Sequence, residues 1–136
     1  MTQSLPEIPL STWHELVAEA NRMMRLSYSP YSKFPVGAAA LVADGRIVSG
    51  CNVENLSYGL TLCAECGLVS QLAATGGGRL VAFACVNANG EPLTPCGRCR
   101  QLLFEHGGAE LQVWWGESTT TIGELLPGAF GPHDMI

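Results

Sequence analysis

The sequence holds few charged residues, and basic residues are especially scarce. Lys and Arg together number seven among 136 residues, whereas Asp and Glu number twelve, so the net charge is −5. A protein that binds nucleic acid through its phosphates needs clustered Lys and Arg side chains. This composition therefore argues against a polynucleotide partner.

The sequence also lacks any hydrophobic run that approaches the roughly 20 residues of a membrane-spanning helix. Its first residues, MTQSLPEIPL, contain no basic segment followed by an apolar one, so we expect a cytoplasmic protein that does not bind membranes. Hydrophobic residues nevertheless make up 47% of the chain, which is enough to form a core. A chain of this length fits a single domain, which we place over residues 1–136.

Six cysteines are the most informative residues of the sequence. In a reducing compartment, paired cysteine spacings indicate a metal site or catalysis before they indicate disulfides. Cys51 and Cys85 lie in the apolar stretches IVSGCNV and LVAFACV, and we expect both to be small buried hydrophobic residues. The other four form one C-x-x-C pair in TLCAECG and another in PCGRCRQ: Cys63, Cys66, Cys96 and Cys99. Two such pairs usually indicate a bound metal ion.

The first half of the chain predicts a helix followed by a hairpin. Thr12 and Glu15 have the spacing of a capping box, and apolar residues recur at helical intervals after them, so we expect a helix over about residues 12–27. The segment SPYSKFP ends this helix with two prolines. The stretches VGAAALVA and RIVSGCNV then predict two strands that are joined at Asp44 and Gly45.

The second half alternates helices with strands. The expected elements are, in chain order, a helix from Cys63 to the glycine run 76–78, the strand RLVAFACV, a helix from Cys96 to Gly107 and Gly108, the strand ELQVWWG, and a short helix that Thr121 and Glu124 cap and Pro127 ends. The strand RLVAFACV is apolar enough to lie in the middle of a sheet. The order α-β-β-α-β-α-β-α predicts an α/β fold, a three-layer α/β/α sandwich around a mixed sheet.

Two kinds of zinc site agree with the cysteine spacing. Four thiolates would make a closed structural site, whereas three would leave the fourth position to a water molecule. The chain is long enough to form a core without a metal crosslink, and Glu65 would add a negative charge beside four thiolates. We therefore favour zinc on Cys63, Cys96 and Cys99, with Glu65 as the proton carrier beside an activated water. This matches the zinc-deaminase signature, in which a Glu lies two residues after the first ligand and a Pro precedes the C-x-x-C pair.

The chain resembles the small homotetrameric cytidine deaminases over about residues 28–132. The segments that carry the resemblance are PYSKFPVGAA, GCNVENLSY, CAE, PCGRCRQ and LLPGAFGP, in that order. The resemblance implies zinc-dependent hydrolysis of the nucleosides cytidine and 2′-deoxycytidine to uridine and 2′-deoxyuridine, a step of pyrimidine salvage. It also implies a homotetramer whose sites are shared between subunits.

Substrate-binding residues follow from the resemblance by matching position: Phe34, Asn52, Glu54, Tyr58, Ala64 and Phe130. Asn52 and Glu54 would bind the ribose hydroxyls, and Phe34 would line the pocket. The Ala64 backbone would meet the pyrimidine edge, and the catalytic Glu65 would reach N3 and the leaving amine. Tyr58 and Phe130 would help to complete the site of a neighbouring subunit.

One position departs from the commonest family pattern, which has an arginine directly after the catalytic Glu. This chain has Cys66 there, so the positive charge that would offset the thiolates has to come from elsewhere. Arg98 and Arg100, beside the second cysteine pair, are the candidates.

Three other functions share part of this pattern. A polynucleotide or tRNA deaminase uses the same zinc chemistry but needs a basic or aromatic surface to hold the strand. An aminonucleoside-antibiotic deaminase resembles the chain around PCGRCRQ, although the segment NVEN favours a plain nucleoside. A noncatalytic Cys₄ zinc module would use all four paired cysteines and would leave Glu65 without a role.

Overall fold

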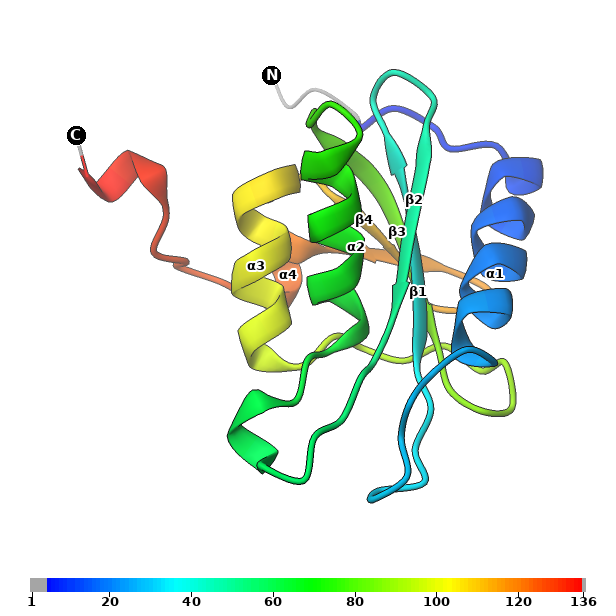
Figure 1. Ribbon diagram of the computed structural model, residues 1–136. Coiled ribbons are helices and arrows are strands. Elements are labelled where there is room, and N and C mark those ends of the chain that lie inside the picture. The colour runs from blue at the N-terminus through cyan, green and yellow to red at the C-terminus, as the bar shows by residue number, and fades with distance from the viewer. Residues whose placement is uncertain (1–4, 136) are drawn as a thin grey trace.

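A five-stranded mixed sheet forms the centre of the computed structural model, which describes residues 5–135 (Figure 1). The strands are β1 (Gly37–Val42), β2 (Ile47–Cys51), β3 (Leu80–Val86), β4 (Gln112–Trp114) and β5 (Thr119–Thr121). They lie in the order β2-β1-β3-β4-β5; β3 and β4 are parallel, and the other neighbours are antiparallel. The most apolar strand, β3, therefore lies in the middle of the sheet, as its sequence predicts.

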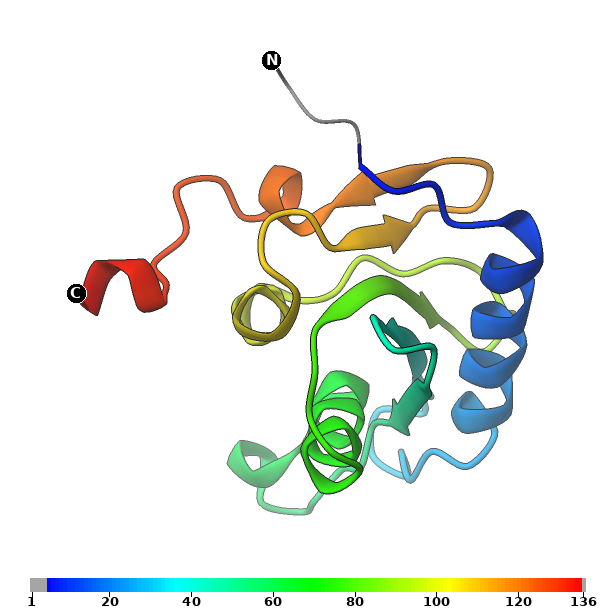
Figure 2. The same ribbon diagram turned by 90° about the horizontal axis from the view of Figure 1, so that it is seen from above.

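Helices cover both faces of this sheet. α1 (Leu10–Met24) packs on one face, and α2 (Ala64–Ala74) and α3 (Gly97–Gly107) pack on the other, as Figures 1 and 2 show. α4 (Ile122–Leu125) follows β5, and 3₁₀ turns lie at Tyr58–Leu60 and Pro132–Met135. The predicted three-layer α/β/α sandwich is confirmed. No helix within residues 5–135 has the length and apolar character that crossing a membrane requires.

The core follows the alternation of side chains along the strands. On β3, Phe83 and Cys85 belong to the cluster packed against α2 and α3, whereas Ala82 and Ala84 belong to the cluster packed against α1. Phe83 is fully buried, and burial of such a side chain contributes about 1.5–3 kcal/mol. Apolar contacts therefore fix α2 and α3 against one face of the sheet.

Gly50 on β2 allows the sheet to approach the start of α2 closely. A Cβ atom at this position would overlap the carbonyl oxygen of Ala64. The neighbouring amide of Ser49 donates a 2.7 Å hydrogen bond to the side chain of Gln71 on α2, at the outer edge of the sheet. These two contacts determine where α2 begins, and therefore where the residues at its N-terminus lie.

The helix ends agree only in part with the prediction. α1 begins at Leu10, where the carbonyl of Pro9 accepts from the amides of Thr12 and Trp13 and no side chain caps the helix, so the predicted Thr12 capping box is wrong. In contrast, Thr121 caps α4 as predicted, because its hydroxyl oxygen accepts from the amide of Glu124 at 3.2 Å.

Three differences from the prediction concern the strands β2, β4 and β5. The pattern of the sequence does not predict β5, and the strand expected over ELQVWWG forms only at Gln112–Trp114. Cys85 is buried as expected, but Cys51 is only half-buried because it ends the edge strand β2.

Candidate active site

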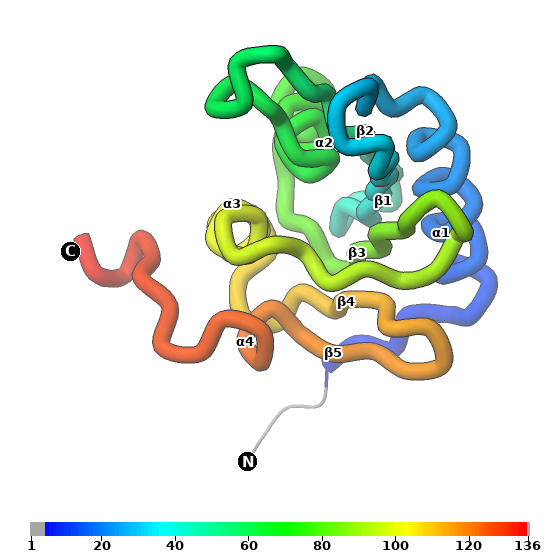
Figure 3. The backbone as a smooth tube through the Cα atoms, turned by 90° about the horizontal axis from the view of Figure 1, so that it is seen from below, coloured from blue at the N-terminus to red at the C-terminus, as the bar shows by residue number. Residues whose placement is uncertain are grey.

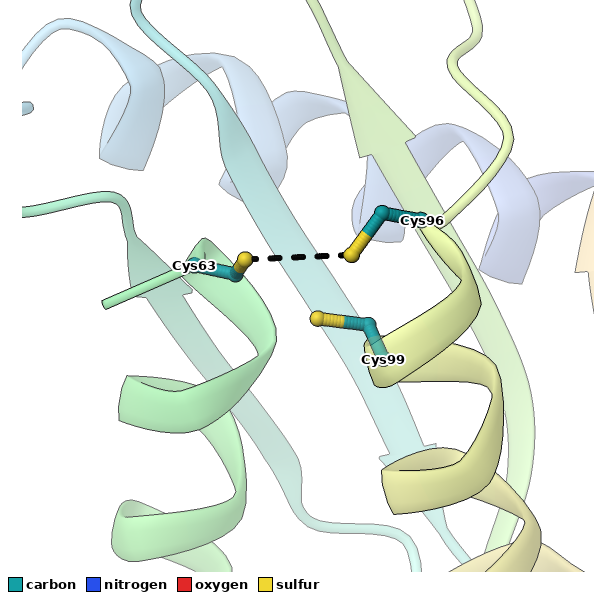
Figure 4. A group of neighbouring side chains, drawn as sticks. All are labelled: Cys63, Cys96 and Cys99. Atoms are coloured by element: carbon teal, nitrogen blue, oxygen red, sulfur yellow. Dashed lines mark hydrogen bonds between the residues drawn. The ribbon is translucent and has the colours of Figure 1, made fainter. Parts of the chain in front are cut away.

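Three cysteine side chains meet where α2 and α3 begin. Cys63 is the N-cap residue of α2, Cys96 is the N-cap residue of α3, and Cys99 lies in the first turn of α3. Their sulfur atoms point toward one another across the gap between the two helix ends (Figure 4). Because the N-terminus of a helix carries a partial positive charge, this is a favourable place for thiolates.

The spacing of the three sulfur atoms fits a zinc ion. The Sγ atoms of Cys63 and Cys96 are 3.9 Å apart, and all three Sγ atoms lie within 4.8 Å of one another. Thiolates at about 2.3 Å from a tetrahedral zinc ion are about 3.8 Å apart, so small shifts bring these three into ligand positions. Cys66 is not part of the cluster. The donor set therefore leaves one zinc position open, as the three-cysteine hypothesis requires.

Burial and hydrogen bonds set the acidity of these thiols. Burial raises the pKa of Cys63 and of Cys99. At Cys96 burial also acts to raise the pKa, but hydrogen bonds from the backbone and thiol of Cys99 outweigh it, and the pKa is lowered. A divalent cation must therefore displace protons when it binds to the cluster.

Glu65 lies beside the cluster and is almost completely withdrawn from solvent. It occupies the first turn of α2, and only 3% of its surface is exposed. Burial raises the pKa of its carboxyl group, although hydrogen bonds from its own amide and from the Cys99 thiol oppose the rise. A carboxyl group with a raised pKa exchanges protons closer to neutral pH than an exposed one, which suits a general acid and base.

A pocket of about 260 Å³ opens onto Glu65 and the cysteine cluster. The predicted site residues in its wall are Phe34, Asn52, Cys63, Ala64, Glu65 and Cys96, and the rest of the wall is Val36, Thr61, Leu62, Cys85, Leu93, Thr94 and Pro95. The loops 25–36, 52–63 and 87–96 that supply most of it reach the end of the sheet where α2 and α3 begin (Figure 1). A mostly apolar pocket with a few convergent polar groups is typical of a small-molecule site.

Asn52 holds the loop that forms one side of this pocket. Its Oδ1 atom accepts from the amide of Val36 at 2.9 Å and from the hydroxyl of Ser27, and its Nδ2 atom donates to the carbonyl of Phe34 at 2.9 Å. A primary amide carries two donor hydrogens, so Nδ2 has a second one for a ligand. Asn52 can therefore donate to a ligand while it keeps Phe34 in place.

Glu54 and Tyr58 line an adjacent hollow of about 430 Å³, and Thr61 borders both this hollow and the pocket. The Glu54 carboxylate accepts from the amides of Tyr31 and Ser32, at 2.9 and 3.1 Å, and from the hydroxyl of Ser32. The hydrogen bond from the Ser32 hydroxyl is the main reason that the pKa of Glu54 is lowered. Glu54 is therefore an ionised acceptor next to the pocket.

Phe130 lines neither hollow. It belongs to the C-terminal segment 126–135, which extends away from the rest of the chain (Figures 1 and 3), and 61% of its surface is exposed. Its backbone carbonyl accepts from the Gln101 side chain on α3 at 2.7 Å. The structure of a single chain therefore does not bring Phe130 to its own pocket.

A larger hollow, of about 580 Å³, lies between α1 and the turn that joins β4 to β5. Trp13, His14 and Trp114 are among the residues that line it, and it contains no cysteine. α1, which forms one wall of this hollow, covers the face of the sheet opposite to α2 and α3 (Figure 2). The reactive groups are therefore gathered in the smaller pocket.

Residues 11–114, well over half of the chain, match the family model for the cytidine and deoxycytidylate deaminase zinc-binding region. The matched range includes both C-x-x-C pairs and Glu65. The chain belongs to this deaminase family. Its cofactor is zinc, and the cluster of Cys63, Cys96 and Cys99 is able to hold it.

The likeness to individual cytidine deaminases extends over nearly the whole chain. A cytidine deaminase of Mycobacterium tuberculosis is 56% identical over 128 residues, which cover 94% of this chain and 96% of the relative. One of Halalkalibacterium halodurans is 42% identical over 125 residues, with coverage of 88% and 95%. A crystal structure of the M. tuberculosis cytidine deaminase, 59% identical, matches with a TM-score of 0.85 and covers 88% of this chain and 97% of that one. The fold of the chain therefore matches that of solved cytidine deaminases, in agreement with the family model.

Arg98 and Arg100, the two arginines beside the second cysteine pair, point in different directions. The Nη2 atom of Arg98 lies 3.6 Å from the Cys63 Sγ atom and 4.0 Å from the Cys66 Sγ atom. Arg100 is turned away, and its guanidinium donates to two backbone carbonyls at 2.8 and 2.9 Å. Of the two arginines that the sequence suggests, Arg98 is therefore the one in contact with the deaminase cluster.

Sequence reasoning missed the apolar wall of the deaminase pocket. Leu62 pairs with Val53 through backbone hydrogen bonds just before α2 begins, a contact that no local pattern indicates. Leu93 lies in a loop without a periodic pattern. Of these wall residues, only the position of Cys85 could be inferred from the sequence. Side chains alternate along β3, so Cys85 lies with Phe83 on the side of α2 and α3. The buried face of α2 consists of Ala64, Glu65, Leu68 and Leu72.

Proposed function

We propose that the protein is a cytidine deaminase that hydrolyses cytidine and 2′-deoxycytidine to uridine and 2′-deoxyuridine, with release of ammonia. The observation that carries the proposal is the buried Glu65 beside a three-thiol cluster, in the pocket of a chain from the deaminase family. A relative that is 56% identical is named a cytidine deaminase. Hydrolytic deamination needs a proton-carrying carboxyl group next to a zinc site with an open position.

In this proposal Cys63, Cys96 and Cys99 hold the zinc ion, which when bound makes a water molecule available as a nucleophile near neutral pH. Glu65 takes up the protons of that water and delivers one to N3 and one to the amine at C4. A C4–O bond forms, the C4–N bond breaks, and the nitrogen leaves as ammonia. Because Glu65 is buried, it exchanges these protons with the substrate and not with bulk solvent.

Asn52 and Glu54 provide a donor and an acceptor for the sugar. The second Nδ2 hydrogen of Asn52 can be donated to a hydroxyl oxygen, and the ionised Glu54 can accept the hydrogen of a hydroxyl. Phe34 lies against the base and sugar, and the Ala64 backbone meets the pyrimidine edge. Free cytosine leaves Asn52 and Glu54 without their partners, so it should be a poor substrate.

We also infer that the protein works as a homotetramer in which Tyr58 and Phe130 complete a neighbouring site. The remote position of Phe130 supports this inference, and so do the exposed apolar side chains on loops 25–36 and 52–63, which supply part of the pocket wall: Tyr28, Tyr31, Leu56, Tyr58, Leu60 and Leu62. Contiguous exposed apolar patches mark interaction sites. The single domain over residues 1–136 and the cytoplasmic location stay predictions.

Ultraviolet absorbance with zinc-loaded protein tests the proposed reaction. Cytidine and 2′-deoxycytidine should both be converted with release of ammonia, whereas cytosine should react slower by a factor of about 10⁴ or more. Glu65→Gln, prepared in the same way, gives the background rate. If the zinc-loaded protein converts neither nucleoside, the proposal fails. If cytosine reacts as well as cytidine, the nucleoside assignment fails.

A further inference from the structure

The guanidinium of Arg98 lies between the starts of α2 and α3. Its Nη2 atom is 3.6 Å from the Cys63 Sγ atom, 4.0 Å from the Cys66 Sγ atom and 3.4 Å from the carbonyl oxygen of Thr61. The side chain therefore starts on one helix and ends on the first ligand of the other. Figure 4 shows the Cys63 thiol on the side of α2 that faces α3. Arg98 is thus a bridge between the two halves of the cysteine cluster.

The cluster needs a positive partner of this kind. Three thiolates outweigh the charge of one zinc ion by a unit, and an ionised Glu65 adds another negative charge nearby. A hydrogen bond from a charged donor to a ligand atom stabilises the charged form of the ligand and fixes its orientation. Arg100 is directed elsewhere, because its guanidinium donates to the carbonyls of Pro95 and Leu125.

We propose that Arg98 is a positioning residue of the zinc site, whose guanidinium holds the Cys63 sulfur toward the metal and supplies from α3 the charge that the commonest family pattern supplies from position 66. The proposal rests on the zinc site described under the proposed function. It assigns a role to Cys66 as well. A short side chain at position 66 leaves the space that Arg98 fills, since Arg98 Nη2 lies 4.0 Å from Cys66 Sγ.

Release of zinc to a chelator with a coloured metal indicator tests the role of Arg98. Losing an interaction that orients a metal ligand typically lowers metal affinity by about 10–100-fold. Because Arg98 is exposed, we expect an effect at the lower end of this range. Arg98→Gln should therefore release zinc about tenfold faster than wild type. The release rate of Arg98→Lys should lie between those of wild type and Arg98→Gln, because lysine keeps the positive charge but lacks the planar set of guanidinium donors. Arg79→Gln is the matched control, since it removes one charge from a surface ion pair with Glu110 and should release zinc at the wild-type rate.

The spectrum of the cobalt-substituted protein reports on the ligand sulfur without any turnover. Loss of a hydrogen bond to Cys63 should shift the sulfur-to-cobalt charge-transfer band in Arg98→Gln, and the band of Arg79→Gln should match wild type. If wild type binds zinc, and Arg98→Gln has the wild-type release rate and the wild-type band, the role of Arg98 is refuted and the proposed reaction is untouched. If wild type binds no zinc, the proposed function itself fails.

A double variant distinguishes the position of the charge from a merely structural role of Arg98. Cys66→Arg combined with Arg98→Ala returns a guanidinium to the Cys63 sulfur from α2, and it should release zinc within about threefold of the wild-type rate. Arg98→Ala alone should stay about tenfold faster than wild type. If the double variant releases zinc as fast as Arg98→Ala, the exchange of roles between positions 66 and 98 is refuted.

Discussion

At the scale of single residues, Glu65 carries an electrostatic cost because it is a carboxyl group almost completely withdrawn from solvent. Glu65 lies beside a cluster of three thiols, and removing a carboxylate from water is unfavourable unless a cation or a proton compensates for it. Burial is the main reason that the pKa of Glu65 is raised. Carboxyl groups with perturbed pKa values in a cleft are typical of catalytic sites, and the position of Glu65 agrees with such a role.

We expect Glu65→Gln to keep its fold and its zinc and to lose about 10²–10⁴-fold in kcat, because glutamine matches the shape of glutamate but cannot carry a proton. The kcat and the zinc content should be measured on the same preparation. Glu110→Gln is the control, since Glu110 is exposed and forms a surface ion pair with Arg79. A Glu65→Gln protein within about tenfold of wild type would contradict the proton-carrier role.

Cys66→Ala should retain about one zinc ion per chain and substantial activity, because Cys66 is outside the cluster of three sulfur atoms. Cys63→Ala, Cys96→Ala and Cys99→Ala should each lose both metal and activity. Metal analysis of the four purified variants, beside a cytidine assay, checks this expectation. Loss of zinc from Cys66→Ala as complete as from Cys63→Ala would favour a closed Cys₄ site.

The cysteine cluster could be predicted from the sequence, because Cys63 and Cys96 both lie where local signals start a helix. The presence of Glu65 then favoured a zinc site with three cysteine ligands over one with four. The role of Asn52 in holding the loop that carries Phe34 could not be predicted, because it depends on contacts of its side chain with the backbone of Val36 and Phe34 that form only in the folded chain. Spacing along the chain reveals ligands on one element and not the contacts between loops.

At the scale of secondary structure, the site depends on the close approach of β2 to α2. We expect Gly50→Ala to destabilise the protein by about 1–3 kcal/mol, because its methyl group would overlap the backbone of Ala64 and push the start of α2 away from the sheet. Zinc affinity should fall as well, since Cys63 directly precedes this helix. Urea unfolding and zinc titration measure the two effects.

Gly67→Ala provides the matched control for Gly50→Ala. Gly67 lies on α2 and faces Gly50, but a Cβ atom there would make only ordinary contacts, at 3.6 Å from the Gly50 Cα atom. Alanine is the better helix former by roughly 1 kcal/mol, so Gly67→Ala should stabilise the protein. Equal stabilities of the two variants would show that the approach of β2 to α2 is not tight.

Local signals account for most of the elements that the sequence predicts. Helical periodicity, the Asp44–Gly45 turn and the apolar run of β3 are properties of short segments, and the elements that they predict are present, although α1 begins and ends earlier than expected. β5 depends instead on pairing with β4, and Thr119–Thr121 is too short to show an alternation. The start of α1 depends on a backbone carbonyl, that of Pro9, which a pattern of side chains cannot reveal.

At the scale of the whole molecule, the C-terminal segment 126–135 extends from the body of the chain and carries the exposed Phe130. If Phe130 completes a neighbouring site, Phe130→Ala should lower kcat/KM and leave the zinc content unchanged. Mixing Phe130→Ala with Glu65→Gln and allowing subunits to exchange should then restore activity, because some hybrid sites combine an intact Glu65 with an intact Phe130.

Light scattering of the purified variants should show tetramers before and after mixing. A mixture of two tetrameric variants that gains no activity would contradict the sharing of sites. A monomeric protein with full activity would contradict the tetramer itself.

The hydrogen bond between Ser49 and Gln71 has a consequence for how the protein behaves at high concentration. An edge strand with free amides can template pairing with other molecules, which is a route to fibrils. The helix that carries Glu65 also engages the edge strand β2, because Gln71 accepts from the Ser49 amide at 2.7 Å. Gln71→Leu would reopen this edge, and we expect thioflavin-binding aggregates to form from it sooner than from wild type at equal concentration. The contact that positions α2 thus also protects the protein against self-association through its sheet.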